Sequence, residues 1–193
     1  MTKGRLEAFS DGVTAIIITI MVLEMEAPHT ADWNGLRPVL PVFGSYLVSF
    51  VFVGIYWNNH HHLMHAVRHV NGRILWANLH LLFWLSLVPF ATRWLGETGL
   101  AAAPVALYGI VFLAAGIAYF ILVRSLLAHP GHTELASAIG SDFKGKISLA
   151  LYVAAILISF LNPALAFAVI VGTAVPWLIP DRRIERQLAK RSS

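Results

Sequence analysis

The sequence predicts an all-α integral membrane protein with six transmembrane helices. Of its 193 residues, 58% are hydrophobic and only 12% are charged, whereas soluble domains average about 45–50% apolar and about 25% charged residues. Several apolar stretches reach the roughly 20 residues that cross about 30 Å of hydrocarbon as a helix. A soluble fold of this length could not hide so much apolar surface. We therefore assign residues 1–193 to a single transmembrane domain in a lipid bilayer.

The six predicted spans follow the apolar stretches in order. The last stretch, from Ile147 to Ile179, is longer than one span needs and contains Asn162-Pro163. This pair favours a turn, because proline cannot continue a helix without losing a hydrogen bond. We divide the stretch into two short spans, and a single kinked helix is the alternative. The predicted spans are residues 6–25, 39–57, 74–94, 103–127, 147–161 and 163–179.

Lysine and arginine residues predict the orientation, because cytoplasmic loops carry an excess of them. If both termini are cytoplasmic, 12 of the 14 basic residues fall inside, and only Arg37 and Arg93 fall outside. A five-span arrangement would instead place the basic C-terminal segment outside. The cytoplasmic set is Lys3, Arg5, Arg68, Arg73, Arg124, Lys144, Lys146, Arg182, Arg183, Arg186, Lys190 and Arg191.

The first span is unusual because acidic residues bound it closely. Its uncharged run, Gly12 to Leu23, has 12 residues, which is about 18 Å at 1.5 Å per residue and too short to cross alone. The helix must therefore include Asp11 and Glu24. Ionisable residues at membrane depth usually face protein or water, so we expect the other five helices to shield this one from lipid.

Helical periodicity separates this first span into two faces. The apolar face could have either of two roles. It can pack against a neighbouring helix, or, if copies of the helix surround a symmetry axis, it can form a hydrophobic constriction that gates ions by dewetting. The apolar side holds Gly12, Ile16, Thr19, Ile20, Leu23 and Ala27, and the polar side holds Ser10, Asp11 and Thr14.

Three motifs in order identify a family. An R-x-x-x-F-S-D motif, Arg5 to Asp11, precedes the apolar run, Trp57-x-x-His60 ends the second span, and Leu75-Trp76-Ala77-Asn78-Leu79 opens the third, which also contains Pro89-Phe90. With these motifs the chain resembles the lysosomal potassium channel family called transmembrane protein 175, in its prokaryotic single-repeat form. The resemblance covers Arg5 to about Trp94, and the remainder matches mainly in hydropathy.

The resemblance implies a potassium-permeable channel, not an enzyme. Members with one repeat form homotetramers in which the first helices line an hourglass pore, and a bacterial member would lie in the inner membrane. The resemblance implies no cofactor besides the permeant potassium ion, no nucleic acid and no other protein partner. It assigns the constriction to Ile16, Ile20 and Leu23, potassium preference to Thr19, and the motif with a polar network at the cytoplasmic mouth to Arg5, Phe9, Ser10, Asp11, His60, Trp76 and Asn78.

Selectivity should be modest. The sequence has no T-V-G-Y-G loop, so no carbonyl cage replaces the hydration shell of the ion. An ion that crosses partly hydrated is discriminated only weakly. We therefore expect potassium to be preferred over sodium by a small ratio.

Other readings concern the histidines and Asp11. His61, His65 and His69 share one helical face and could bind zinc, but no cysteine or nearby acid completes the set, so we predict no metal site. The cluster 60–69 could instead sense pH, since histidine titrates near neutrality. A proton-coupled transporter using Asp11 is the alternative function, although no paired inverted repeat supports it. No H-E-x-x-H or phosphate-loop motif indicates an enzyme.

Overall fold

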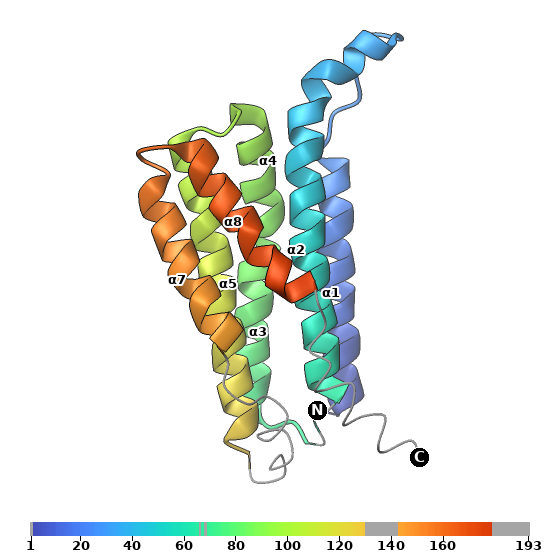
Figure 1. Cartoon of the computed structure of the whole chain (residues 1–193). Coiled ribbons are helices and arrows are strands. Elements are labelled where there is room, and N and C mark those ends of the chain that lie inside the picture. Colours follow the sequence, from blue (N-terminus) through green and yellow to red (C-terminus); the bar gives the residue numbers. More distant parts are fainter. Residues whose placement is uncertain (1, 66, 68, 130–142, 179–193) are drawn as a thin grey trace.

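All regular structure is helical among the residues that the computed structural model describes, which are 2–65, 67, 69–129 and 143–178. This confirms the predicted all-α class. Six antiparallel segments form the bundle (Figure 1). Its helices are α1 (Lys3–Leu23), the 3-10 helix η1 (Trp33–Val39), α2 (Leu40–His65), α3 (Gly72–Ser86), α4 (Val88–Thr98), α5 (Ala102–Leu127), α7 (Phe143–Ile158) and α8 (Pro163–Leu178).

The core lies around α5, which packs against α3, α4, α7 and α8. This helix is apolar on all sides, as expected of a helix surrounded by others. Tyr108 and Phe112 are fully buried, and small residues such as Ala115 and Ala118 let neighbouring backbones approach. The bundle is therefore held together by a helix in the second half of the chain.

The helix α1 lies at the edge of the bundle, and among the described elements it packs mainly against α2, α3 and α4 (Figure 1). The expectation that the other five helices shield it is therefore wrong for a single chain. Only 28% of its most apolar window is buried, because its buried residues form one narrow stripe. Much of the rest of its circumference is exposed in the described part of the chain.

The second helix is longer than its hydropathy indicates. α2 continues to His65, past the predicted end at residue 57, because asparagine and histidine side chains end the apolar run without ending the helix. At the other end, η1 and the start of α2 project beyond the bundle (Figure 1). There the Asp32 carboxylate accepts a hydrogen bond of 3.0 Å from the Gly35 amide.

The third span consists of two helices, α3 and α4, which meet at Leu87. Pro89 has no amide hydrogen to donate, and it lies in the first turn of α4, where that loss costs nothing. The Leu87 amide bonds to the Trp84 carbonyl at 3.2 Å, and the Ala91 amide bonds to the Leu87 carbonyl at 3.1 Å. The chain therefore continues as one span, from Gly72 to Thr98.

The last two helices are separated where the sequence predicts a turn. The Asn162 side chain accepts a hydrogen bond of 3.0 Å from the Leu165 amide and so caps α8. α7 and α8 have 16 residues each, about 24 Å at 1.5 Å per residue. Within the described residues, four helical segments are long and apolar enough to cross a membrane by length and composition: Lys3–Leu23, Trp33–His65, Gly72–Thr98 and Ala102–Leu127.

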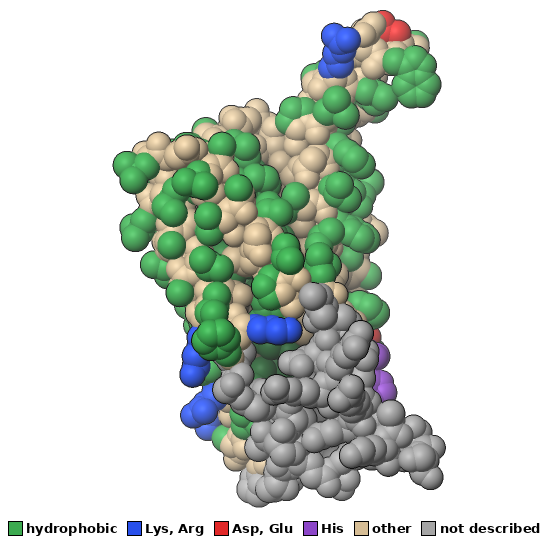
Figure 2. All heavy atoms as spheres, viewed as in Figure 1, with side chains coloured by type: hydrophobic (Ala, Val, Ile, Leu, Met, Phe, Trp, Pro, Cys, Tyr) green, Lys and Arg blue, Asp and Glu red, His purple; other side chains and the backbone are tan. Residues whose placement is uncertain are grey.

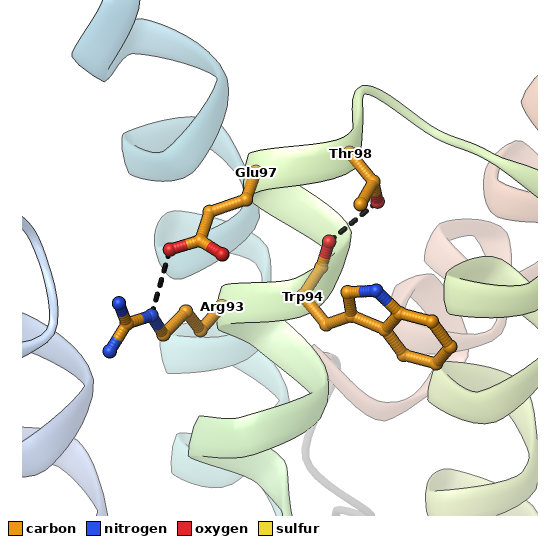
Figure 3. Close-up of polar contacts among 4 residues, drawn as sticks. All are labelled: Arg93, Trp94, Glu97 and Thr98. Atoms are coloured by element: carbon orange, nitrogen blue, oxygen red, sulfur yellow. Dashed lines mark hydrogen bonds and ion pairs between the residues drawn. The ribbon is translucent and has the colours of Figure 1, made fainter.

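Charged side chains lie at the ends of the bundle. In Figure 2 hydrophobic side chains cover the middle of the visible face, and basic side chains lie below them and on the projecting tip. Near the same end as η1, Arg93 Nε donates to Glu97 Oε1 at 2.8 Å, and Thr98 Oγ1 donates to the Trp94 carbonyl at 2.6 Å (Figure 3). The predicted outer residues Arg37 and Arg93 thus lie opposite the start of α1. The C-terminal basic residues and Arg68 lie outside the described residues.

Candidate functional site

The candidate site is built on α1, which presents two different faces. Leu6, Ser10, Ile17 and Met21 are almost completely buried against the neighbouring helices. Together with the buried Thr14 they recur every three or four residues, as one stripe of a helix must. The other side of α1 is exposed: Ile16 is 57%, Ile20 39% and Leu23 81% exposed. We call this stripe the bare face of α1. Of the residues that periodicity assigned to the polar side, Ser10 and Thr14 are buried against the bundle, whereas Asp11 is exposed.

A buried hydrogen-bond chain holds the N-terminal half of α1. Asn78 Nδ2 of α3 donates to Ser10 Oγ at 2.9 Å, and His60 Nε2 of α2 lies 2.7 Å from Asn78 Oδ1. An amide oxygen only accepts, so His60 carries its proton on Nε2. The Ser10 hydroxyl donates its own hydrogen bond to the Leu6 carbonyl at 2.8 Å. All three side chains are buried, and the chain joins α1, α2 and α3.

Asp11 is held separately from this buried chain. Trp57 Nε1 of α2 donates to Asp11 Oδ1 at 2.9 Å, and the His61 ring stacks on the Trp57 ring with centroids 5.8 Å apart. Asp11 is exposed and, among the described residues, makes no ion pair with Arg5. The contact fixes the carboxylate to α2 at the edge of the bare face.

A second polar cluster, which sequence reasoning missed, supports the C-terminal half of α1. Ser49 of α2 shares hydrogen bonds with Thr92 of α4 at 2.7 Å and with Tyr108 of α5 at 2.9 Å. Thr92 Oγ1 also lies 3.8 Å from Met21 Sδ on α1. Hydroxyl groups inside apolar helices commonly bond across helix interfaces. Ser49 and Thr92 interrupt apolar runs, and that was the available signal.

The remaining predicted site residues lie apart from the buried chain. Thr19 is exposed on the bare face, and its hydroxyl donates to the Ile16 carbonyl at 2.9 Å. Phe9 and Arg5 are exposed on the same side of α1, and Trp76 is 73% exposed on α3. Within the described part of the chain, no hydrogen bond joins Arg5 or Trp76 to the Ser10–Asn78–His60 chain. Their predicted membership of the network stays a prediction.

The histidines do not form the predicted helical face. α2 ends at His65, so His69 lies beyond the helix and stacks instead on His129, with centroids 6.1 Å apart. The His61 and His65 rings remain neighbours at 4.8 Å. No group of three histidine or acidic residues that could hold a metal occurs in the described ranges. Whether the cluster senses pH stays a prediction.

Comparison with known proteins gives consistent similarities. A family model described as "Endosomal/lysosomal potassium channel TMEM175" matches residues 5–89. A Chryseobacterium protein named as a potassium channel is 56% identical over 97% of this chain and 98% of its own length. A Streptomyces collinus protein, also named as a potassium channel, is 35% identical over 61% of each chain.

A solved structure extends the similarity to the fold. The crystal structure from Chamaesiphon minutus, described as that of a lysosomal potassium-selective channel TMEM175 homolog, superposes with a TM-score of 0.76 at 28% identity. The match covers 91% of this chain and 96% of the other. The similarity thus extends well beyond the motif-bearing first half, which was all that the motifs alone could cover.

Proposed function

This chain belongs to the TMEM175 family of channels, and from that premise we propose that it is one subunit of a potassium-permeable channel. Bacterial relatives are named as potassium channels, which supports potassium as the permeant ion. A channel moves an ion down its gradient and makes or breaks no covalent bond. The proposal therefore includes no catalysis and no cofactor.

The bare face of α1 is the observation that carries this proposal. Ile16, Ile20 and Leu23 are large apolar side chains on α1. The other face of this helix is buried against the bundle and hydrogen-bonded to α3. Lipid could cover such a stripe only if the helix had enough uncharged length. The uncharged run from Gly12 to Leu23 is about 18 Å long, against about 30 Å of hydrocarbon. A shared water-filled conduit accommodates Asp11 and Glu24 at its two ends, and lipid does not.

In the proposed assembly, four copies of α1 surround one axis. Ile16, Ile20 and Leu23 then form rings that narrow the conduit, and such rings can gate by dewetting. Thr19, exposed between them, is the proposed contributor to potassium preference. Because no carbonyl filter is present, potassium should be favoured over sodium only modestly. A permeability ratio in the hundreds from bi-ionic reversal potentials would contradict this.

We place the homotetramer in a bacterial inner membrane with both termini in the cytoplasm. Lys3 and Arg5 at the start of α1 support this orientation under the positive-inside rule. A subunit count on the detergent-solubilised protein tests the assembly directly. If the purified protein is a monomer, it has no symmetry axis around which four α1 helices could form a pore, and the proposal is wrong.

The substitution Ile16→Asn tests the constriction. A polar side chain should wet the narrow point, so the single-channel conductance should rise or the selectivity should weaken. The matched control is Ile110→Asn on α5, because Ile110 is also an exposed isoleucine but lies away from the axis. Currents from the control should equal those of the unmodified channel. If Ile16→Asn also leaves conductance and selectivity unchanged, Ile16 is not in the constriction.

The alternative function is a proton-coupled transporter with Asp11 as carrier. The exposed Asp11 carboxylate, held by Trp57, is the feature that such a mechanism would use. Flux measurements in liposomes separate the two. A channel passes potassium down its gradient without a coupled ion, whereas a transporter requires a fixed stoichiometry with protons.

A further inference from the structure

Two polar side chains on the outside of the bundle lie at membrane depth. His80 of α3 is exposed and lies eight residues after the start of the 27-residue span Gly72–Thr98. At 1.5 Å per residue it is about 12 Å from the start of a span about 40 Å long, so it lies roughly 7 Å inside about 30 Å of hydrocarbon. Asn58 of α2 is half-buried and lies at the same depth. His60 is bonded to Asn78, and each of the two polar residues lies two positions further outward along its helix.

Neither side chain is fully satisfied within one chain. Trp84 Nε1 donates to His80 Nε2 at 2.9 Å, so Nε2 is the acceptor and the neutral ring carries its proton on Nδ1. In the part of the chain that the structure describes, this proton has no acceptor and the Asn58 side chain makes no hydrogen bond. A donor that faces hydrocarbon is costly. The amide oxygen of Asn58 is an acceptor of the kind that His80 lacks.

The two side chains point away from each other in a single chain. Residues two apart on a helix point about 200° apart. Because His60 and Asn78 face each other between α2 and α3, Asn58 and His80 face outward, on opposite flanks of the bundle. The helix α1 packs against both α2 and α3. A ring of copies around α1 therefore brings the α3 flank of one copy to the α2 flank of the next.

The two flanks also match in shape. Gly54 lies one turn from Asn58 on the same face of α2, and a Cβ atom there would meet nothing within 4 Å, so the surface has a notch. Phe83 lies one turn from His80 on the same face of α3, and its side chain is 55% exposed. Counted from the bonded pair between α2 and α3, the notch and the ring differ by one residue, or about 1.5 Å in depth. A rotation about the membrane normal keeps every residue at its depth, so the ring can enter the notch of another copy.

We propose that His80 and Phe83 of one copy dock on Asn58 and Gly54 of the neighbouring copy, with His80 Nδ1–H donating to Asn58 Oδ1. Two different surfaces meet in this contact, and such head-to-tail contacts can close into a ring. The contact rests on the proposed assembly around α1. Lipid acyl chains are the alternative cover for these flanks, but they supply no acceptor for the His80 proton.

Cysteine cross-linking tests the contact directly, because the chain has no cysteine of its own. The double variant Gly54→Cys/Phe83→Cys of the full-length protein in lipid nanodiscs is treated with a short bis-methanethiosulfonate reagent. Linked species of up to four chains should form, and none larger. Neither single variant should link by itself, because its cysteines lie on flanks that do not meet. A co-assembled mixture of the two single variants should give two-chain species only.

A second cysteine pair keeps the test decisive if Gly54→Cys does not assemble. Phe50 of α2 and Phe90 of α4 are 43% and 61% exposed. Each lies within two residues of the bonded pair Ser49–Thr92, so they are also close in depth. The variant Phe50→Cys/Phe90→Cys should therefore link in the same way as the first pair.

A matched control moves one cysteine to a different face. Val153 of α7 is 47% exposed and lies outside the proposed contact, so Gly54→Cys/Val153→Cys should stay unlinked between chains. Linking of this control between chains overturns the contact. Linking of Phe83→Cys alone overturns it as well, because α3 would then meet α3.

The hydrogen bond is tested by a double-mutant cycle on the fraction of assembled protein after dilution in detergent. Asn58→Leu and His80→Leu should each weaken association about three- to tenfold, the equivalent of one interhelical bond in a membrane. The double variant should be no weaker than the weaker single variant. The control is Asn59→Leu, since Asn59 donates to the Ile55 carbonyl of its own helix at 2.8 Å, and its effect should add to that of His80→Leu. Additive effects of Asn58→Leu and His80→Leu overturn the hydrogen bond.

The outcomes separate this contact from the proposed function. An assembled tetramer in which neither cysteine pair links overturns the contact and leaves the proposed channel. A monomeric protein overturns the proposed assembly and the contact with it. A linked tetramer that passes no potassium current refutes the proposed function and supports the contact.

Discussion

The substitution Asn78→Leu should destabilise the assembled protein strongly, because Asn78 is the middle member of the buried chain that anchors α1. It is completely buried, and it bonds to His60 at 2.7 Å and to Ser10 at 2.9 Å. Leucine has a similar volume but no polar atoms. The His60 Nε2 proton would then remain buried without an acceptor.

The size of the effect follows from the two broken contacts. An orphaned buried donor such as His60 Nε2–H costs about 1–3 kcal/mol. Ser10 keeps its bond to the Leu6 carbonyl and loses only the bond from Asn78. An average interhelical hydrogen bond in a membrane contributes about 0.6 kcal/mol. The total is about 2–4 kcal/mol. At about 2–4 °C per kcal/mol for a chain of this size, the apparent Tm should fall by roughly 5–15 °C.

Thermal unfolding in detergent, followed by loss of the assembled peak in size-exclusion chromatography, measures this shift. Ser10→Ala and Ser125→Ala form a matched control pair. Both serines are buried and bond to a carbonyl of their own helix, but only Ser10 also accepts a bond from another helix. Ser10→Ala should therefore cost more than Ser125→Ala. A Tm for Asn78→Leu equal to that of the unmodified protein would refute the anchoring role.

Three further changes probe other contacts of α1 and α2. Trp57→Phe should cost only about 0.5–1.5 kcal/mol, because the abandoned Asp11 carboxylate is exposed and water replaces the indole; a loss equal to that of Asn78→Leu would contradict this. Gly96→Val should lower the apparent Tm by overpacking, since a Cβ there would lie 2.7 Å from Val42 Cα, and an unchanged Tm would mean that α4 and α2 separate freely. Hydrogen bonds from the Gly35 amide and the Thr30 hydroxyl hold the pKa of Asp32 below its ordinary 3.8. The stabilisation is therefore complete above that ordinary value and is lost as the pH falls through the lowered pKa. Amide exchange at Gly35 should report this, and loss of protection already at about pH 6 would contradict the assignment.

Apolar length and turn chemistry made most of the fold predictable. Hydropathy located the six segments, and Asn162-Pro163 indicated the turn before α8, where the asparagine caps the helix. Hydropathy could not locate the end of α2, because the residues between Trp57 and His65 are polar but helical. The division of the third span at Leu87 was also hidden, although Pro89 was the residue that could have indicated it.

The features of the site that depend on a single helix could be predicted from the sequence. The 3.6-residue period separated the buried Ser10 and Thr14 from the exposed Ile16 and Ile20. The contacts of Trp57 with Asp11, and of Ser49 with Thr92, join residues that are 46 and 43 positions apart. Such pairings depend on how the helices pack, which no local pattern encodes. The expected shielding of α1 by the other five helices failed for the same reason, because the number of helices that pack against it also depends on the tertiary arrangement.

The clamped face of α1 limits how a pore built from it could open. Rotating α1 to withdraw Ile16 from the axis would break its bonds to Asn78 and Trp57. At about 0.6–1.7 kcal/mol for each interhelical bond in a membrane, eight such bonds in four subunits cost roughly 5–14 kcal/mol. Wetting of the constriction breaks none of them. In the proposed tetramer, opening by small side-chain and water rearrangements is therefore favoured over rotation of the first helix.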